Sequence, residues 1–439
     1  MKKTIMFMGS ALFACFVQAA ATVSNVAVRQ HWPWSNKVDI DFVLEDSEGE
    51  THDVSLVLKN GTKMIAYSRT EVIGALENLA PGTHRLTWNP SGVDQPVLDS
   101  LTATVEVDDD PKKYLILDLT GGYSANEPIP YIWAAKEPVG GWFQGGSDLT
   151  YRGAKMVFRH IKAGSFVMGS PGSETGRNAT FEAQRSVTLT KDFYIGILPL
   201  TYTQVMNVYG SVVPMSGYAP SSNAVLSFVS MQYLRGTNCM ENWPAVDDNS
   251  VSGAFNRRLT ALTEELPGYS FDVPTAAQWE YACRADTTTA HYNNTEVNTL
   301  TDPNPGQRNT ALYDPGLEGI AIYKYNTKLA DGTQTNLFCK LAPNEWGLYH
   351  MLGGPHWEMI RDGIAWNGSN LNPGPIVSAD GECTKGSRSA YFWGRGGESI
   401  AECGACRAAS WKAIANGIAG RGSFQGYNSV RMCLMYKGE

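Results

Sequence analysis

The sequence predicts two folded parts, an all-β sandwich over about residues 22–110 and a loop-rich domain with few long helices after it. Residues 22–110 alternate apolar and polar side chains in short runs such as KVDIDFVLED, and turn signals such as Asn60-Gly61 and Pro81-Gly82 separate the runs. From about Tyr151 the pattern changes to short elements joined by long loops. A chain of 439 residues is also too long for one ordinary core, so at least two domains are expected.

The first residues have the pattern of a secretory signal peptide. Lys2 and Lys3 precede an apolar stretch, and the small residues Ala19 to Ala21 follow it. This predicts a signal peptide over residues 1–21 and an exported protein, whether periplasmic, secreted or at the cell surface. An alternative is a lipoprotein, because Leu-Phe-Ala-Cys ends at Cys15, although apolar residues continue past it. The stretch is shorter than the roughly 20 apolar residues of a membrane span, and no later stretch qualifies, so no transmembrane segment is expected.

The net charge disfavours nucleic acid as a partner, and the number of cysteines limits how they can pair. The formal net charge is −8, and removal of Lys2 and Lys3 takes it to −10. An acidic chain without a basic run is a poor nucleic-acid binder. Export implies an oxidising compartment in which cysteines can pair. Without Cys15 seven cysteines remain, so at least one thiol stays free or pairs outside the chain.

The all-β part is expected to be a spacer or docking module. It resembles the immunoglobulin-like or fibronectin-like modules of secreted bacterial proteins, and it contains no cluster of titratable residues. The charged run DDDPKK at 108–113 marks its end. One more strand follows, and the segment 111–150, rich in glycine and proline, is predicted to be a connector to a domain over 151–439.

Three helices are predicted in the second part. Thr201 with Gln204, and Thr275 with Gln278, form capping boxes at the starts of two of them. A third helix spans 250–266, where apolar residues recur at helical spacing. On the helix after Thr275, Cys283 is interpreted as a small buried residue.

Several segments in order then resemble one family. They are AGSFVMGSPGSETGR, VTLTKDFYIGILPLTYTQVMNVYG, FDVPTAAQWEYACRADTTT, PNEWGLYHMLGGPHWEMIRDG, GRGGES with CRAAS, and GYNSVRMCL. Together these segments resemble the formylglycine-generating enzyme family, or sulfatase-modifying-factor domains, over about residues 151–436. The resemblance implies an α+β fold related to C-type lectins, with little regular secondary structure.

The resemblance also implies a chemistry, from which this sequence departs. The family's enzymes oxidise a protein cysteine to formylglycine with oxygen and with copper held by two cysteines. Counted from the R-G-G motif, the second of these falls on Cys406, but the first falls on Ala401, and Glu398 replaces the family's serine. Cys403 is the candidate substitute for the missing thiol. Copper is therefore expected only if Cys406 and Cys403 are catalytic, because thiolates are the ligands that select Cu(I).

The C-x-x-C spacing of Cys403 and Cys406 leaves four interpretations open. The pair could be a redox dithiol, part of a metal site, a structural disulfide, or two separate thiols with Cys406 half-buried under a cleft. The neighbouring Glu402 disfavours a reactive thiolate, because its negative charge raises a thiol pKa.

The resemblance carries over a possible calcium site and a binding cleft. The calcium ligands would be Glu358, the carbonyl group of Gly353 and, in place of the family's Asp or Asn, His350. A histidine suits calcium poorly, because this cation prefers oxygen ligands.

Four further residues are expected to line a cleft near the C-terminus: Trp357, Arg395, Glu398 and Arg407.

Two functions from different classes remain. The first is an exported family member that does not generate formylglycine and uses the lectin-like scaffold to bind a protein or glycan ligand at this cleft. Segment 410–429, mostly small and polar, would be a display loop there. The alternative is an oxidoreductase of the formylglycine-generating type acting through Cys406.

Overall fold

The computed structural model divides into two compact units, Met1–Asp110 and Pro111–Glu439. The described residues are 21–65, 67, 71–90, 100–121, 128–143, 149–209, 225–227, 231–235, 255–263, 266, 268–301, 312–327, 340–363, 365–366, 371–372, 391–415 and 428–436. The predicted signal peptide, apart from Ala21, and most of the predicted display loop lie outside them. Among the described residues, no helix has the length and apolar character needed to cross a membrane.

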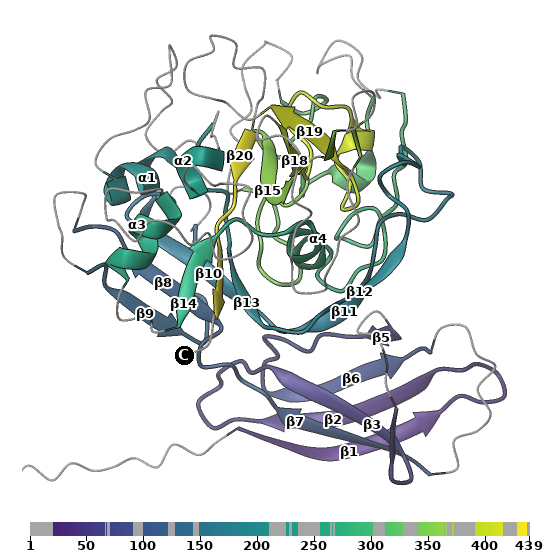
Figure 1. Ribbon diagram of the computed structural model, residues 1–439. Helices are drawn as coiled ribbons and strands as arrows, with labels where there is room; N and C mark the ends of the chain where they lie inside the picture. The colour runs from purple at the N-terminus through teal and green to yellow at the C-terminus, as the bar shows by residue number, and fades with distance from the viewer. Residues whose placement is uncertain are drawn as a thin grey trace, which may run out of the picture. The chain divides into compact units, whose positions relative to one another are not determined.

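The first unit consists of two sheets, seen in purple and blue in Figure 1. The sheets have the orders β1-β2-β6-β5 and β4-β3-β7. Their strands are β1 (Thr22–Gln30), β2 (Val38–Glu45), β3 (Val54–Asn60), β4 (Lys63–Ile65), β5 (Val72–Ile73), β6 (Gly82–Trp88) and β7 (Leu101–Val107). Alternate residues of both sheets enter one core, as Ile40, Leu58 and Leu86 illustrate. The all-β prediction for this unit is confirmed.

The segment 111–150 differs from the predicted connector. It contributes two strands, β8 (Tyr114–Asp118) and β9 (Tyr131–Ala134), to the main sheet of the second unit. Strand β8 pairs with β10 (Lys155–Ile161), a partner about 40 residues further along the chain, and Leu115 and Leu117 are buried. The strand expected directly after DDDPKK is thus β8, and its apolar residues belong to the second core. The boundary between the units lies at Asp110, where the all-β part was predicted to end.

The second unit contains one six-stranded sheet with the order β14-β21-β13-β10-β8-β9. The remaining strands of this sheet are β13 (Phe193–Gly196), β14 (Tyr269–Asp272) and β21 (Cys433–Tyr436). Each face of the sheet covers a separate core, because successive residues of a strand point to opposite faces. Val157 and Ile195 enter one core, whereas Phe158 and Tyr194 enter the other.

Smaller sheets and short helices complete the second unit. The sheets are the hairpin β11 (Gly164–Met168) with β12 (Arg185–Leu189), the hairpin β16 (Ala365–Trp366) with β17 (Leu371–Asn372), and the four-stranded sheet β19-β18-β15-β20. The strands of the last are β15 (Trp357–Gly363), β18 (Tyr391–Arg395), β19 (Lys412–Ala415) and β20 (Asn428–Val430). Sheet is thus abundant and helix sparse, so the second unit is mostly β and fits the expected α+β class only loosely.

Three helices form where capping and periodicity predicted them, and the short helix α2 was not predicted. Helix α1 (Tyr202–Tyr209) and helix α4 (Ala276–Arg284) both begin with reciprocal capping bonds, from Thr201 and Thr275 respectively. Helix α3 (Phe255–Leu262) confirms the described part of the third prediction. Helices α1 and α2 (Met231–Arg235) pack against α3, which covers β14. Helix α4 lies between β15 and the β11–β12 hairpin (Figure 1) and buries Cys283, as predicted.

Candidate functional site

The R-G-G motif forms a turn directly after β18. Gly396 and Gly397 have φ values of +88° and +90°, which residues with a side chain rarely adopt. A Cβ on Gly397 would lie 2.8 Å from the Cys406 sulfur, and one on Gly396 would lie 2.7 Å from the Met351 carbonyl oxygen. Glycine is therefore required at both positions, because the Met351 backbone leaves no room for a side chain at Gly396 and the Cys406 side chain leaves none at Gly397.

Cys403 and Cys406 are free thiols in the core of the second unit. They occupy the start and the C-cap of a single 3-10 turn (Cys403–Ala405), and the Cys406 N–H donates to the Cys403 carbonyl oxygen over 2.9 Å. Both side chains are buried, so Cys406 is not half-buried as expected but fully enclosed. Of the four interpretations, the structure agrees with two separate thiols.

Burial also sets the charge state of the two thiols. It raises the pKa of Cys406 far above the ordinary range, and it raises the pKa of Cys403, with Asp314 and Glu402 adding to the effect. Both groups are therefore neutral thiols near pH 7, and the thiolate is the form that attacks substrates and binds metals. With Ala401 at the first catalytic position, the residues present do not fit a copper ion held by two thiolates.

Arg395 lies in the interior and not in a cleft. Its guanidinium group contacts the Glu280 carboxylate, donates to the Ala408 carbonyl oxygen over 2.8 Å, and stacks between Trp279 and Trp411. Burial alone would raise the pKa of Glu280, but the charges of Arg395 and Arg284 hold it below its ordinary value. The expected ligand-binding role of Arg395 is thus replaced by a buried ion pair that joins β18 to α4.

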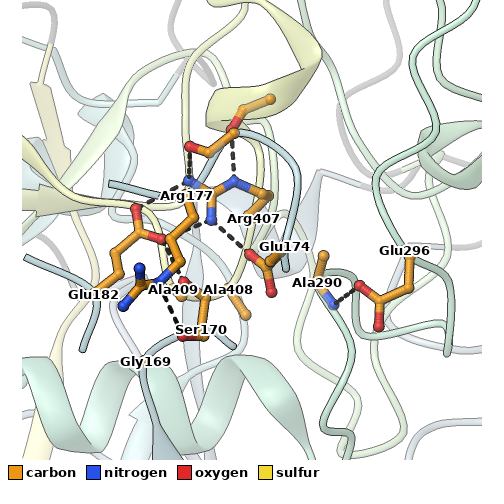
Figure 2. A network of polar contacts seen from close by, with 12 residues as sticks. Gly169, Ser170, Glu174, Arg177, Glu182, Ala290, Glu296, Arg407, Ala408 and Ala409 are labelled. Carbon is orange, nitrogen blue, oxygen red and sulfur yellow. Dashed lines mark hydrogen bonds and ion pairs between the residues drawn. The ribbon is translucent and has the colours of Figure 1, made fainter. Parts of the chain in front are cut away.

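Arg407 is likewise buried, and Figure 2 shows the network around it. Nη1 donates to Glu174 over 2.5 Å and to Glu182 over 2.7 Å, and Nη2 donates to Glu182 over 2.9 Å. The Gly176 carbonyl oxygen accepts from Nη2 and the Gly404 carbonyl oxygen from Nε, each over 2.7 Å. All five donor positions of a guanidinium are thus occupied by the protein itself, which leaves none for a ligand.

The oxygen atoms expected to bind calcium are bonded to other groups of the domain. The Glu358 carboxylate accepts from Arg431 over 2.7 and 3.0 Å and from the Trp279 indole over 2.7 Å. The Gly353 carbonyl oxygen accepts from the Ile322 N–H over 2.9 Å. His350 is buried, and burial lowers its pKa to about 3, so it is a neutral nitrogen ligand at most. These residues do not fit calcium, because the ion would have to displace Arg431 from Glu358.

Of the four expected cleft residues, Glu398 alone is partly exposed, whereas Trp357, Arg395 and Arg407 are buried. A parallel bridge pairs Glu398 with Gly354, and the Ser399 hydroxyl donates to the Pro355 carbonyl oxygen over 3.3 Å. Burial raises the pKa of the Glu398 carboxyl, while the Trp357 indole and the Lys412 ammonium act in the opposite direction. Glu398 thus lies beside the segment that precedes β15.

A serine–histidine pair between this segment and Ser227, 129 residues earlier, was not predicted. Ser227 Oγ lies 2.7 Å from His356 Nε2, and burial lowers the pKa of His356 to about 4. The imidazole is therefore neutral near pH 7. His356 belongs to the GGPHWE motif, where one residue more than the family pattern precedes Trp357, and that insertion was the available signal. Nothing near Ser227 in the sequence marks it as a partner.

We define residues 354–356 and 398–399 as the 354–356/398–399 edge, in which Pro355, His356, Glu398 and Ser399 are partly exposed. It offers the Ser399 hydroxyl, the Glu398 carboxyl group with its raised pKa and, nearby, the exposed Lys412 ammonium, whereas His356 is bonded to the buried Ser227 and its Nδ1 atom is buried. Such groups suit hydrogen bonding to a ligand. No cluster of three or more metal-ligating side chains occurs among the described residues.

Two solved structures are similar to part of the chain. PvdO from Pseudomonas aeruginosa is 17% identical, with a TM-score of 0.43, over 64% of this chain and 94% of that one. Treponema denticola variable protein 1 is 16% identical, with a TM-score of 0.42, over 64% of this chain and 95% of that one. No curated protein sequence matches the chain.

The family profile of the sulfatase-modifying factor enzyme 1-like domain matches residues 148–431. This match spans well over half of the 439 residues, and its start lies close to the predicted start of the second domain. The chain therefore belongs to the family of proteins with a sulfatase-modifying factor enzyme 1-like domain.

Proposed function

We propose that this protein is an exported member of the family that does not generate formylglycine and that binds a protein or glycan ligand at the 354–356/398–399 edge. The observation that carries the proposal is the state of the two cysteines. Cys406 and Cys403 are buried neutral thiols, and Ala401 has no thiol at the position of the family's first catalytic cysteine. A reaction that depends on two thiolates has no starting point in this arrangement.

The rest of the region supports binding over oxidation. The arginines and the calcium-site glutamate of the family pattern bond to other parts of the domain, so they hold the scaffold together. What remains accessible is a set of hydrogen-bonding groups. Function on such scaffolds depends on the site and not on the fold.

The proposal predicts that the protein does not generate formylglycine, and an assay for that reaction tests it. The purified full chain is given Cu(I), oxygen and a cysteine-containing sulfatase peptide, and aldehyde is sought by mass spectrometry, with an active formylglycine-generating enzyme as positive control. No product is expected. Formylglycine that forms with the wild type and disappears with Cys406→Ser would contradict the proposal and support the oxidoreductase alternative.

Export is tested separately, since it rests on the N-terminal pattern of charge, apolar core and small residues. N-terminal sequencing of the protein from its native host should begin between about Ala20 and Ser24. A chain that retains Met1 and remains in the cytoplasm would contradict export. An N-terminus at a lipid-modified Cys15 would replace the soluble form with the lipoprotein.

A further inference from the structure

The first unit exposes two tryptophans in the turn between β1 and β2. The Trp34 side chain is 89% exposed and Trp32 is 39% exposed, with Pro33 between them. A tryptophan is a large apolar group that proteins seldom leave in water without a use, and exposed tryptophans are enriched at binding sites. We call residues 32–34 the tryptophan turn.

Bonds at its base hold the turn in place. The His31 N–H donates to the Lys37 carbonyl oxygen over 3.0 Å, and the Trp34 N–H donates to the His31 carbonyl oxygen over 3.0 Å. His31 Nε2 lies 2.9 Å from an Asp39 carboxylate oxygen, which fixes the residue directly before Trp32. Pro33 restricts the backbone further, because its ring fixes φ. A turn whose backbone is already ordered loses little backbone entropy on binding.

The turn adjoins a row of side chains across the sheet. The register places Arg29 opposite Asp39, Asp39 opposite Thr87, and Thr87 opposite Ile73. All four therefore lie on one face, and their neighbours two residues away share it. Asp39 is nearly buried beneath its partners: Arg29 donates to it over 2.8 Å and Thr87 over 2.9 Å.

A second row lies beside the first. Arg85 opposes Asp41, and its Nε and Nη2 donate to the two carboxylate oxygens over 2.6 and 2.9 Å. The Arg29 and Arg85 side chains remain 58% and 52% exposed, and that of Asp41 remains 36% exposed. The face therefore presents paired donors and acceptors at fixed spacing, with charges of both signs alternating.

This combination selects one class of ligand. An anionic ligand would meet Asp41, and a cationic ligand would meet Arg29 and Arg85, so neither sign of charge is favoured overall. A sugar hydroxyl both donates and accepts hydrogen bonds, and the C–H face of a sugar ring is apolar. We infer that the tryptophan turn and the adjoining Arg–Asp rows form a binding site for a neutral polysaccharide, with one sugar ring stacked on Trp34 and hydroxyls of neighbouring sugars along the polysaccharide bonded to Arg85 and Asp41.

The site lies on the first unit, so it goes beyond the function proposed for the second. The two are distinguishable, because the formylglycine assay involves no residue of the tryptophan turn. The inference gives the all-β unit a role as a carbohydrate-binding module in place of a passive spacer.

Affinity electrophoresis of the full chain in gels that contain neutral polysaccharides (xylan, mannan, β-glucan) tests the inference. At least one should retard the wild type, and Trp34→Ala should weaken its binding by about 30-fold, the loss typical of a central aromatic contact. Asp41→Asn, which keeps the shape of the side chain, should weaken it less. Val139→Ala removes a 98% exposed apolar side chain from the second unit and should leave binding unchanged. Circular dichroism checks that each variant is folded.

Three results would overturn the inference. The first is the absence of retardation in every neutral gel. The second is Trp34-dependent binding to phosphatidylcholine or phosphatidylglycerol vesicles in place of glycans, which would make the turn a membrane contact. The third is a change in small-angle X-ray scattering with Trp34→Ala, since the turn would then pack within the protein itself.

Discussion

The sulfur of Cys406 lies against the backbone of Gly397, so closely that a Cβ on the glycine would come within 2.8 Å of it. The thiol at the position of the family's second catalytic cysteine thus fills the space beneath the R-G-G turn. The same contact accounts for the burial of Cys406 and for the requirement for glycine.

Replacing Gly397 should therefore destabilise the second unit. Gly397→Ala forces a side chain into a φ of +90° and into contact with the Cys406 sulfur, which should lower the free energy of unfolding by about 2–4 kcal/mol. Urea unfolding followed by tryptophan fluorescence measures the change. Gly404→Ala is the matched control, because its Cβ would meet nothing closer than 3.9 Å. Equal losses in the two variants would show that the turn is not specifically constrained.

The buried thiols should resist modification in the folded protein. Iodoacetamide at pH 8, followed by peptide mapping, should leave Cys403 and Cys406 unmodified in buffer and alkylate both in 6 M guanidinium, because burial raises their pKa values and blocks access. Peptide mapping is needed because Cys239, Cys339 and Cys383 lie outside the described residues. Rapid alkylation of Cys406 in the folded chain would argue for an accessible active site.

The network around Arg407 should contribute strongly to stability. Arg407→Lys keeps the charge but cannot supply five donors, so Glu174 and Glu182 lose part of their compensation in the interior. The expected loss is about 3–5 kcal/mol, typical of a broken buried pair. Lys324→Met removes a partner of Glu402 in an exposed pair and should cost at most about 1 kcal/mol. Similar small losses in both variants would show that the Arg407 network contributes little.

Acid should destabilise the second unit through its buried histidines. Burial lowers the pKa values of His291, His350 and His356 to between about 3 and 4, from an ordinary value of 6.5. Between these values the unfolded chain binds protons that the folded chain does not, so stability falls as the pH is lowered from about 6.5 to 4.

His350→Asn isolates one of these contributions. Each histidine adds up to about 1.4 kcal/mol of instability per pH unit in that window, and the variant should remove one such share. Asparagine also tolerates the left-handed backbone of His350, whose φ is +58°. Urea unfolding at pH 7 and pH 5 gives the comparison. His350→Ala should show the same reduced pH dependence at a lower stability, and an unchanged pH dependence in both variants would refute the assignment.

Local features of this fold could be predicted from the sequence, because their causes lie within a few residues. The capping pairs Thr201–Gln204 and Thr275–Gln278 form as predicted, since each involves residues three apart. The alternation in KVDIDFVLED likewise identified β2, because a strand exposes alternate residues to one core.

The environment of the candidate site could not be predicted in the same way. The carboxylates that neutralise Arg407 lie 225 and 233 residues before it, and Glu280 lies 115 residues before Arg395. A motif gives the type of residue but not its burial, so arginines that are interior were expected in a cleft. The calcium prediction likewise used residue types alone, whereas the group that bonds to Glu358 is Arg431, 73 residues away.

The position of β21 in the central sheet has a consequence for the order in which the domain folds. This strand, near the end of the chain, lies between β13 and β14 and pairs with both. During synthesis β14 is made long before β21, its neighbour in the sheet. More than 150 further residues must be synthesised before β21 can pair with the edge of β14. Contacts so distant in the sequence slow folding, because a long loop must close first. A nascent chain that stalls before Cys433 would carry an incomplete sheet, so the six-stranded sheet of the second unit can be completed only after β21 has left the ribosome.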